Sequence, residues 1–230
     1  MIPGKMPLDE YQKLVEHNPM QKNSIRRIFA ESYQEFIDIF YDDLDVVIDL
    51  LDENPQLSRE DSEDKITGVL IMLFRMLGYD ASHGKVGGGS KDITVIGRNP
   101  AWSWIGEAKK FNSVTDLSEG WKQLTTRYRN ASSMYAQGGL LAYNFQDDAA
   151  GRLAGWLKKL SGMKLPGFTV RACERRPGLA FHSVHKHKAT GLPFDVRHMI
   201  VSLNFAPEDK SGRTAKTYQQ PKARRKKVAV

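Results

Sequence analysis

The chain has 230 residues and a mass of 26.0 kDa, and 40% of its residues are hydrophobic and 27% charged. This composition is typical of a globular protein with one substantial core, and it excludes fibrous, collagen-like and fully disordered chains. The longest uninterrupted apolar run, residues 69–74, is far shorter than the roughly 20 residues that cross a bilayer, and the N-terminus lacks the apolar region of a signal peptide. We therefore expect an intracellular, cytoplasmic protein that has no membrane partner.

Charge is distributed unevenly along the sequence. Residues 1–120 carry a net charge of −8 and residues 121–230 a net charge of +15, which gives the total of +7. A basic segment is attracted to phosphates whatever their sequence, so the second half favours a nucleic-acid partner, although membrane-surface and merely soluble proteins can carry the same excess. The single cysteine, Cys173, permits no disulfide within the chain and no cysteine-built zinc site.

The first 57 residues predict an acidic helical module. Apolar residues recur near a 3.6-residue period over residues 24–40, and the pattern continues over 44–51. Residues 31–64 contain thirteen Asp or Glu and one Arg. We interpret this segment as a solvated helical face; the alternatives are a contact for a basic protein partner or a shield against misplaced DNA.

The next segment predicts one helix, three strands, a second helix and a fourth strand. The first helix begins near Ser58, which Asp61 follows at capping distance, and it ends before Gly78. Trp102 and Trp104 share one strand face and are expected to pack against a helix. The predicted elements are the helix 58–77, strands 79–83, 92–97 and 102–110 with a Gly-rich turn at 84–91, the helix 116–135 ended by Gly138-Gly139, and the strand 139–145.

The last third predicts a helix followed by strands. The helix covers residues 149–160, and the strands cover 168–173, 179–185 and 196–205. The tail, residues 208–230, is poor in hydrophobic residues and is expected to be disordered. Five of the six residues 222–227 are basic, which suits a tether for nucleic acid or a nuclear address.

Chemistry concentrates in two of the predicted strands. Asp92 opens one strand, and after fourteen intervening residues Glu107, Ala108 and Lys109 close the next. Side chains alternate along a strand, so Glu107 and Lys109 share a face, and a neighbouring strand can bring Asp92 beside them. Two converging carboxylates suit a hard cation such as Mg²⁺. The alternative is an ordinary strand start and a solvated strand end.

Residues 58–145 resemble the PD-(D/E)xK nuclease superfamily. The resemblance rests on the helix that carries Glu63, on Asp92 with the apolar residues after it, on the triplet from Glu107 to Lys109, and on the order of elements, which is similar to that superfamily's αβββαβ core. Lys91 stands where the superfamily often has proline. Gln123 and Tyr128 are similar to a Gln/Tyr motif of some branches, with one residue more between them.

The resemblance implies a role for each of these positions. Asp92, Glu107 and the backbone carbonyl of Ala108 would bind the metal, and Lys109 would position or activate the attacking water. Glu63 would reach the metal through water, with Glu60 as the alternative. Gln123 would orient Lys109 or contact a phosphate, and Arg127 and Arg129 would contact phosphates.

A basic stretch near the C-terminal strands is the other candidate for nucleic-acid contact. Lys186 and Lys188 alternate there with His185 and His187. We interpret Lys186 and Lys188 as candidate phosphate contacts. The histidines, together with His182 and His198, are candidates for nucleic-acid contact or for a zinc site.

The sequence thus predicts an α/β protein with a restriction-endonuclease-like αβββαβ core, a mixed central sheet and extra C-terminal strands. The predicted domains are the acidic module 1–57, a nuclease domain 58–207 and the tail. The predicted function is a Mg²⁺- or Mn²⁺-dependent endonuclease that acts on DNA rather than RNA, with a restriction or phage-defence role, and a homodimer would let two sites cut two strands. The alternatives are a noncatalytic nucleic-acid-binding module and an RNA-directed nuclease or toxin.

Overall fold

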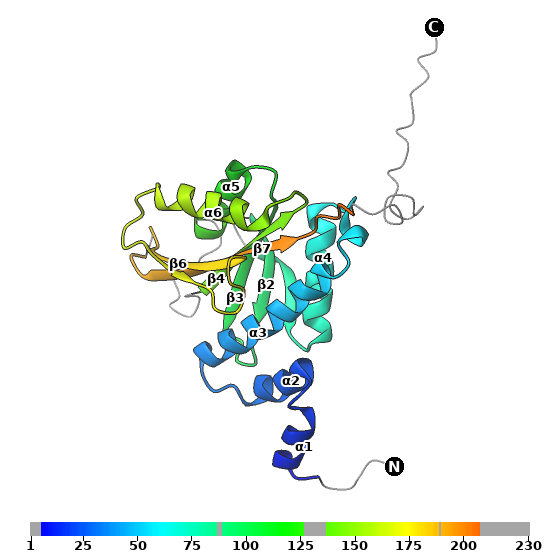
Figure 1. The fold of residues 1–230 in the computed structure, drawn as a ribbon. Coiled ribbons are helices and arrows are strands. Elements are labelled where there is room, and N and C mark those ends of the chain that lie inside the picture. The colour runs from blue at the N-terminus through cyan, green and yellow to red at the C-terminus, as the bar shows by residue number, and fades with distance from the viewer. Residues whose placement is uncertain (1–5, 87–88, 127–136, 189, 208–230) are drawn as a thin grey trace.

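The centre of the protein is a seven-stranded mixed sheet with helices on both faces (Figure 1). The computed structural model describes residues 6–86, 89–126, 137–188 and 190–207. The strand order is β1-β2-β3-β4-β7-β6-β5, in which β3, β4 and β7 run parallel and the other neighbouring pairs run antiparallel. This architecture confirms the predicted α/β class and the mixed sheet.

The elements between residues 63 and 144 follow one another in the predicted order of helix, three strands, helix and strand. The helices are α1 (Leu8–Val15), α2 (Pro19–Phe29), α3 (Tyr33–Asp52), α4 (Glu63–Met76), α5 (Val114–Thr126) and α6 (Ala149–Ser161), with a short 3-10 helix at Pro55–Ser58. The strands are β1 (Asp80–Val86), β2 (Gly89–Ile96), β3 (Ser103–Lys110), β4 (Gln137–Asn144), β5 (Thr169–Ala172), β6 (Ala180–Lys186) and β7 (Pro193–Ser202). Among the described residues, no helix is long and apolar enough to cross a membrane.

Helix α3 is part of the main hydrophobic core. Its residues Phe36 and Phe40 pack on Trp102 and Trp104, with ring centroids 6.4 and 4.8 Å apart. This contact confirms that the two indoles pack against a helix. The same cluster of buried residues includes α3, α4 and one face of the sheet. The boundary predicted at residue 57 therefore falls inside one continuous core, and only α1 and α2 project from it (Figure 1).

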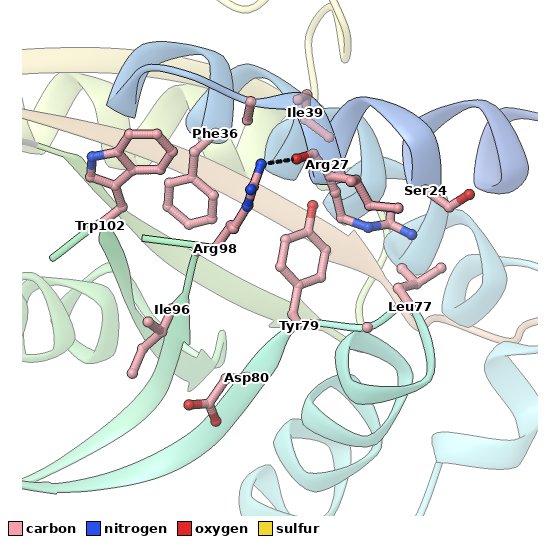
Figure 2. Close-up of a pocket in the computed structure, with 14 residues that line it drawn as sticks. Ser24, Arg27, Phe36, Ile39, Leu77, Tyr79, Asp80, Ile96, Arg98 and Trp102 are labelled. Carbon is pink, nitrogen blue, oxygen red and sulfur yellow. Dashed lines mark hydrogen bonds between the residues drawn. The ribbon is translucent and has the colours of Figure 1, made fainter. Parts of the chain in front are cut away.

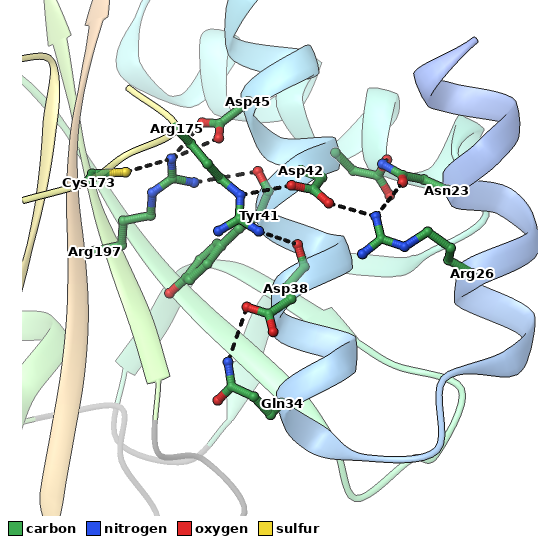
Figure 3. A network of polar contacts seen from close by, with 11 residues as sticks. Asn23, Arg26, Gln34, Asp38, Tyr41, Asp42, Asp45, Cys173, Arg175 and Arg197 are labelled. Carbon is green, nitrogen blue, oxygen red and sulfur yellow. Dashed lines mark hydrogen bonds and ion pairs between the residues drawn. The ribbon is translucent and has the colours of Figure 1, made fainter. Parts of the chain in front are cut away.

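The carboxylates of α3 are paired within the molecule. Arg197, buried in β7, donates to both oxygens of Asp45 at 2.8 Å (Figure 3). The neighbouring ion pairs join Arg175 to Asp42 and Arg176 to Asp49 and Asp52. The expectation of a solvated acidic face is wrong for this side of α3, because its carboxylates pair with arginines, and a permanently charged guanidinium is costly to bury without such a partner.

Two helix boundaries differ from the predictions. The helix expected over residues 24–40 is broken at Ala30, and Ile28 and Phe29, expected on its buried face, are 58% and 54% exposed. Helix α4 begins at Glu63 rather than near Ser58, because the hydroxyl of Ser62 accepts a hydrogen bond from the N–H of Lys65 at 3.2 Å and caps the helix. The turn before it is a 3-10 helix that begins at Pro55.

Several strand boundaries differ as well. Most of the predicted turn 84–91 is strand, since β1 extends to Val86 and β2 begins at Gly89. Gly138 and Gly139 lie within β4 instead of ending a helix, and residues of β3 and β7 leave no room for a side chain at either position. Strand β7 begins three residues early, at Pro193. The predicted end of the helix at residue 135 and the predicted disordered tail lie outside the described residues.

Candidate active site

The site lies where β2 and β3 separate. The pairing of β2 with β3 runs from Ile96 opposite Ser103 to Ile93 opposite Gly106. Beyond that pair, the N–H groups of β3 that face β2 donate hydrogen bonds to carboxylates instead of to a strand. Asp92 accepts from the N–H of Ala108 at 3.0 Å, and Glu63 accepts from the N–H of Lys110 at 2.7 Å. The end of β3 therefore fixes two acids that come from different elements.

Glu63 reaches this point because α4 begins beside the end of β3. The hydroxyl of Thr67, one turn later, donates to the carbonyl of Glu63 at 2.9 Å and shares a hydrogen bond of 3.0 Å with the hydroxyl of Tyr143 in β4. Both side-chain groups are buried. These hydrogen bonds hold the first turn of α4 against the sheet and thereby position the Glu63 carboxylate.

Three carboxylates surround the ammonium of Lys109. The Lys109 Nζ atom lies 2.7 Å from Glu107 Oε1, 3.2 Å from Glu63 Oε1 and 3.6 Å from Asp92 Oδ2. Glu107 and Lys109 are two residues apart in β3 and share a face, as alternation requires. The structure therefore brings together Asp92, Glu107, Lys109 and Glu63, four of the side chains that the sequence predicted at the site. Glu60 is exposed in the turn before α4 and is not among the contacts of Lys109.

The pKa values of Glu107 and Lys109 are both raised, but for different reasons. Burial, reinforced by the nearby Asp92 carboxylate, raises the pKa of Glu107 to about 7. Burial by itself lowers the pKa of Lys109, but contact with Glu107, Asp92 and Glu63 outweighs this effect and holds that pKa above its ordinary value. At neutral pH Lys109 is therefore an ammonium that donates hydrogen bonds and not a base that could remove a proton.

The carboxylates of this cluster fit a hard divalent cation. The Glu107 side chain is 1% exposed, and among the described residues no hydrogen bond reaches either of its oxygens, while the Lys109 ammonium forms an ion pair with Oε1 at 2.7 Å. Like charges on facing strands destabilise a sheet unless a cation lies between them. Within the described ranges, no group of three or more His, Cys, Asp or Glu side chains is arranged to hold a metal ion. Mg²⁺ commonly uses one or two carboxylates and keeps several waters, so Asp92 and Glu107 suffice for such a site.

Helix α5 covers the cluster, and Gly120 is a site residue that the sequence analysis missed. A Cβ atom at Gly120 would lie 2.7 Å from Lys109 Cγ and 3.4 Å from Glu107 Cγ. The glycine therefore allows α5 to approach the two side chains. Gln123 lies one turn further along α5, and its buried Oε1 has no hydrogen-bond partner in the part of the chain that the structure describes. No hydrogen bond between Gln123 and Lys109 is present among the described residues.

The predicted lysine contacts lie at the opposite end of the sheet. Lys186 pairs with Pro193 at the start of β7, whereas Glu107 aligns through Leu140 with His198. These positions are five residues apart along β7, roughly 17 Å at 3.3 Å per residue. Lys186 and Lys188 are both exposed. Arg127, Tyr128 and Arg129 lie outside the described residues.

The histidines of the C-terminal strands are structural. His182, His185, His187 and His198 are all buried, so their interpretation as surface contacts for nucleic acid is wrong. His198 Nδ1 accepts from the indole N–H of Trp156 at 3.0 Å, and its Nε2 lies 2.8 Å from the hydroxyl of Ser183. Burial, and then the neighbouring histidines, lower the pKa of His198 to about 3, so this ring is neutral.

Comparison with protein-family models, with curated proteins and with solved structures found no match for this chain. The geometry of the site and the resemblance in its motifs are therefore the grounds for a functional proposal.

Proposed function

We propose that the chain is a divalent-cation-dependent nuclease that hydrolyses phosphodiester bonds, in DNA rather than RNA. One observation carries the proposal, namely the convergence of Asp92, Glu107 and Lys109 where two strands separate. Converging carboxylates that can hold a cation and a fixed ammonium are the groups that phosphoryl transfer needs, since negative charge builds up on the phosphate oxygens in the transition state.

Each residue has a defined part in this chemistry. Asp92 and Glu107, with the Ala108 carbonyl, would hold Mg²⁺ or Mn²⁺, which would lower the pKa of a water and offset charge on the leaving oxygen. Lys109 donates hydrogen bonds to the attacking water or to a phosphate oxygen. Glu63 is bound to both the ammonium of Lys109 and the N–H of Lys110, so it orients Lys109.

The order of elements supports the finer assignment to a restriction-endonuclease-like core. Asp92 and Glu107 lie on the second and third strands after α4, and α5 and β4 follow. In the PD-(D/E)xK superfamily, which residues 58–145 resemble, the metal-binding acids occupy such neighbouring strands. Agreement between residue order and fold order is stronger support than the spacing of Asp, Glu and Lys alone.

The test is a cleavage assay with matched charge controls. Glu107→Gln and Lys109→Met should each lower cleavage at least a hundredfold, because they remove a cation ligand and the fixed ammonium. Glu119 and Lys122 form an ion pair of the same 2.7 Å length on the exposed side of α5, so Glu119→Gln and Lys122→Met should retain full activity. Plasmid, linear duplex, single strand and RNA are assayed with Mg²⁺, Mn²⁺ or EDTA. Full activity of both site variants would refute the proposal.

A second function, binding nucleic acid without cleaving it, is favoured by a different observation. Five exposed lysines, none in an ion pair within the described residues, lie in α6, in β6 and shortly after each of them: Lys158, Lys159, Lys164, Lys186 and Lys188. Retention of duplex by the wild-type protein with no product in Mg²⁺ or Mn²⁺ would select this function. Cleavage of RNA alone would select an RNA-directed nuclease or toxin. A homodimer, a restriction or phage-defence role and a basic protein partner stay predictions.

A further inference from the structure

A cavity of about 610 Å³ lies at the end of the sheet opposite the carboxylate cluster (Figure 2). It is bounded by α2 and α3 on one side and by the start of β1 and the end of β2 on the other. Its volume is within the range of small-molecule sites, roughly 300–1,000 Å³. Nothing in the proposed nuclease chemistry uses this space.

Aromatic side chains form much of its wall. Phe36, Tyr79 and Trp102 all line the cavity and are otherwise nearly buried. Phe36 stacks on Trp102 at an interplanar angle of 23° and meets Tyr79 edge-on at 63°. Such packed rings are held rigidly, so they present fixed apolar surfaces to a ligand.

Two arginines line the same cavity, Arg27 and Arg98, and only Arg98 has no carboxylate partner among the described residues. Arg27 is compensated, because it donates to the buried Asp43 at 2.5 Å and lies over the ring of Tyr79. Arg98 projects among the aromatic side chains and donates through Nη1 to the carbonyl of Ile28 at the end of α2. Among the described residues, no carboxylate forms an ion pair with Arg98, so this guanidinium retains both its charge and further N–H donors.

We propose that this cavity binds a flat aromatic ring that carries one anionic group, such as a nucleoside monophosphate or an aromatic carboxylate. The apolar walls accept the ring, and the planar fork of Arg98 matches the geometry of a phosphate or a carboxylate. One anionic group is specified because, among the described residues that line the cavity, Asp43 already compensates Arg27 and Arg98 is the one arginine without a carboxylate partner. The proposal does not depend on nuclease activity.

Calorimetric titration in EDTA tests the proposal with three probes: adenosine 5′-monophosphate, adenosine and indole-3-carboxylate. We expect one of the two anions to bind, and adenosine to bind about tenfold more weakly than its monophosphate if the monophosphate is that anion. Binding by indole-3-carboxylate alone would identify the source of the anion as a carboxylate. No binding by either anion, or equal binding of adenosine and its monophosphate, would overturn the proposal.

Variants then assign the binding to the cavity. Arg98→Gln should weaken binding of the anion about tenfold or more. Arg175→Gln removes an exposed arginine that does not line the cavity, and it should leave the affinity unchanged. Ile28→Trp changes an exposed residue that lines the cavity, and the larger side chain should block the ligand while Arg98 is retained. This variant tests whether the ligand binds in the cavity even if Arg98→Gln fails to fold.

The carboxylate cluster supplies the last control. Glu107→Gln should bind the anion with wild-type affinity, because Glu107 lies at the other end of β3 from Trp102. Loss of binding in Glu107→Gln, or wild-type binding in Arg98→Gln, would place the ligand outside the cavity and overturn the inference. Failure of the cleavage assay leaves this titration unaffected.

Discussion

Glu107 is a carboxylate that the fold buries against a second carboxylate. Its side chain is 1% exposed, and its pKa rises to about 7 through burial and the charge of Asp92. A raised carboxyl pKa means that the folded state binds more protons than the unfolded state between about pH 4.5 and 7. The free energy of unfolding therefore falls as the pH rises through this window. The residue thus lowers stability at the pH where it would serve as a cation ligand.

Glu107→Gln should accordingly stabilise the protein at pH 8. In EDTA we expect the free energy of unfolding to rise by about 2 kcal/mol at pH 8, because Gln carries no charge to desolvate and Lys109 keeps Asp92 and Glu63. At pH 4, where Glu107 is protonated, the gain should vanish. Urea unfolding at the two pH values measures the difference.

The control for this prediction is Glu119→Gln, at a side chain that is 60% exposed, which should change stability little at either pH. A loss of stability in Glu107→Gln at pH 8 would contradict the prediction, since it would mean that the ionised Glu107 is net stabilising beside Lys109.

At the scale of the element, β4 depends on glycine for its position in the sheet. A Cβ atom at Gly139 would lie 2.3 Å from the Trp104 side chain and 2.9 Å from Met199. Trp104 is fully buried and contacts Phe40 of α3, so it has no space into which to move. The glycine therefore sets the distance between β4 and the indole.

Gly139→Ala should lower the free energy of unfolding by roughly 2 kcal/mol, because the added methyl group overpacks the core. Gly155, within α6, provides the matched control, since a Cβ atom there has no neighbour within 4 Å. Gly155→Ala should raise stability by about 0.5–1 kcal/mol through the better helix propensity of alanine. Thermal unfolding of the two variants compares them, and a tolerated Gly139→Ala would show that β4 can shift.

The elements also show which features the sequence could predict. Alternation and β-branched residues identified β2 and β3, and with them the shared face of Glu107 and Lys109. The break between α2 and α3 was missed because the apolar period runs across it, although Ser32 and Glu35 have the spacing of a capping box. The local apolar pattern therefore predicts that a helix is present, but the cap at Ser32 decides where one helix ends and the next begins.

Long-range contacts in the site were beyond the reach of the sequence. The bond from Lys110 N–H to Glu63 joins residues 47 apart, and it depends on how α4 lies against the sheet. The close approach of Gly120 to Lys109 depends in the same way on the docking of α5. The sequence could place Glu63 and Gly120 on their helices, but not at the site by geometry alone.

At the scale of the whole molecule, part of the uneven charge of the chain forms ion pairs between the acidic N-terminal half and the basic C-terminal half. The acidic α3 lies against β7, and its carboxylates pair with Arg197 of β7 and with Arg175 and Arg176 of the connection between β5 and β6 (Figure 3). Arg197 is fully buried, lies over the ring of Tyr41 at 4.9 Å and also contacts Cys173 Sγ at 3.3 Å. Asp45 is the carboxylate that compensates this guanidinium, so the pair couples the two halves of the chain.

Asp45→Asn should therefore lower the free energy of unfolding by about 3 kcal/mol, because it leaves a buried guanidinium without a counter-charge. The double variant Asp45→Leu with Arg197→Met should lose less, since it removes both charges together and keeps apolar volume. Glu119→Gln, in an exposed ion pair, should lose less than about 0.5 kcal/mol. Urea unfolding followed by tryptophan fluorescence and by far-ultraviolet circular dichroism measures all three.

Because α3 and the strands share this pair and one core, the fluorescence and circular dichroism signals should coincide in the wild type. Separate transitions would show that the acidic helices unfold independently of the sheet.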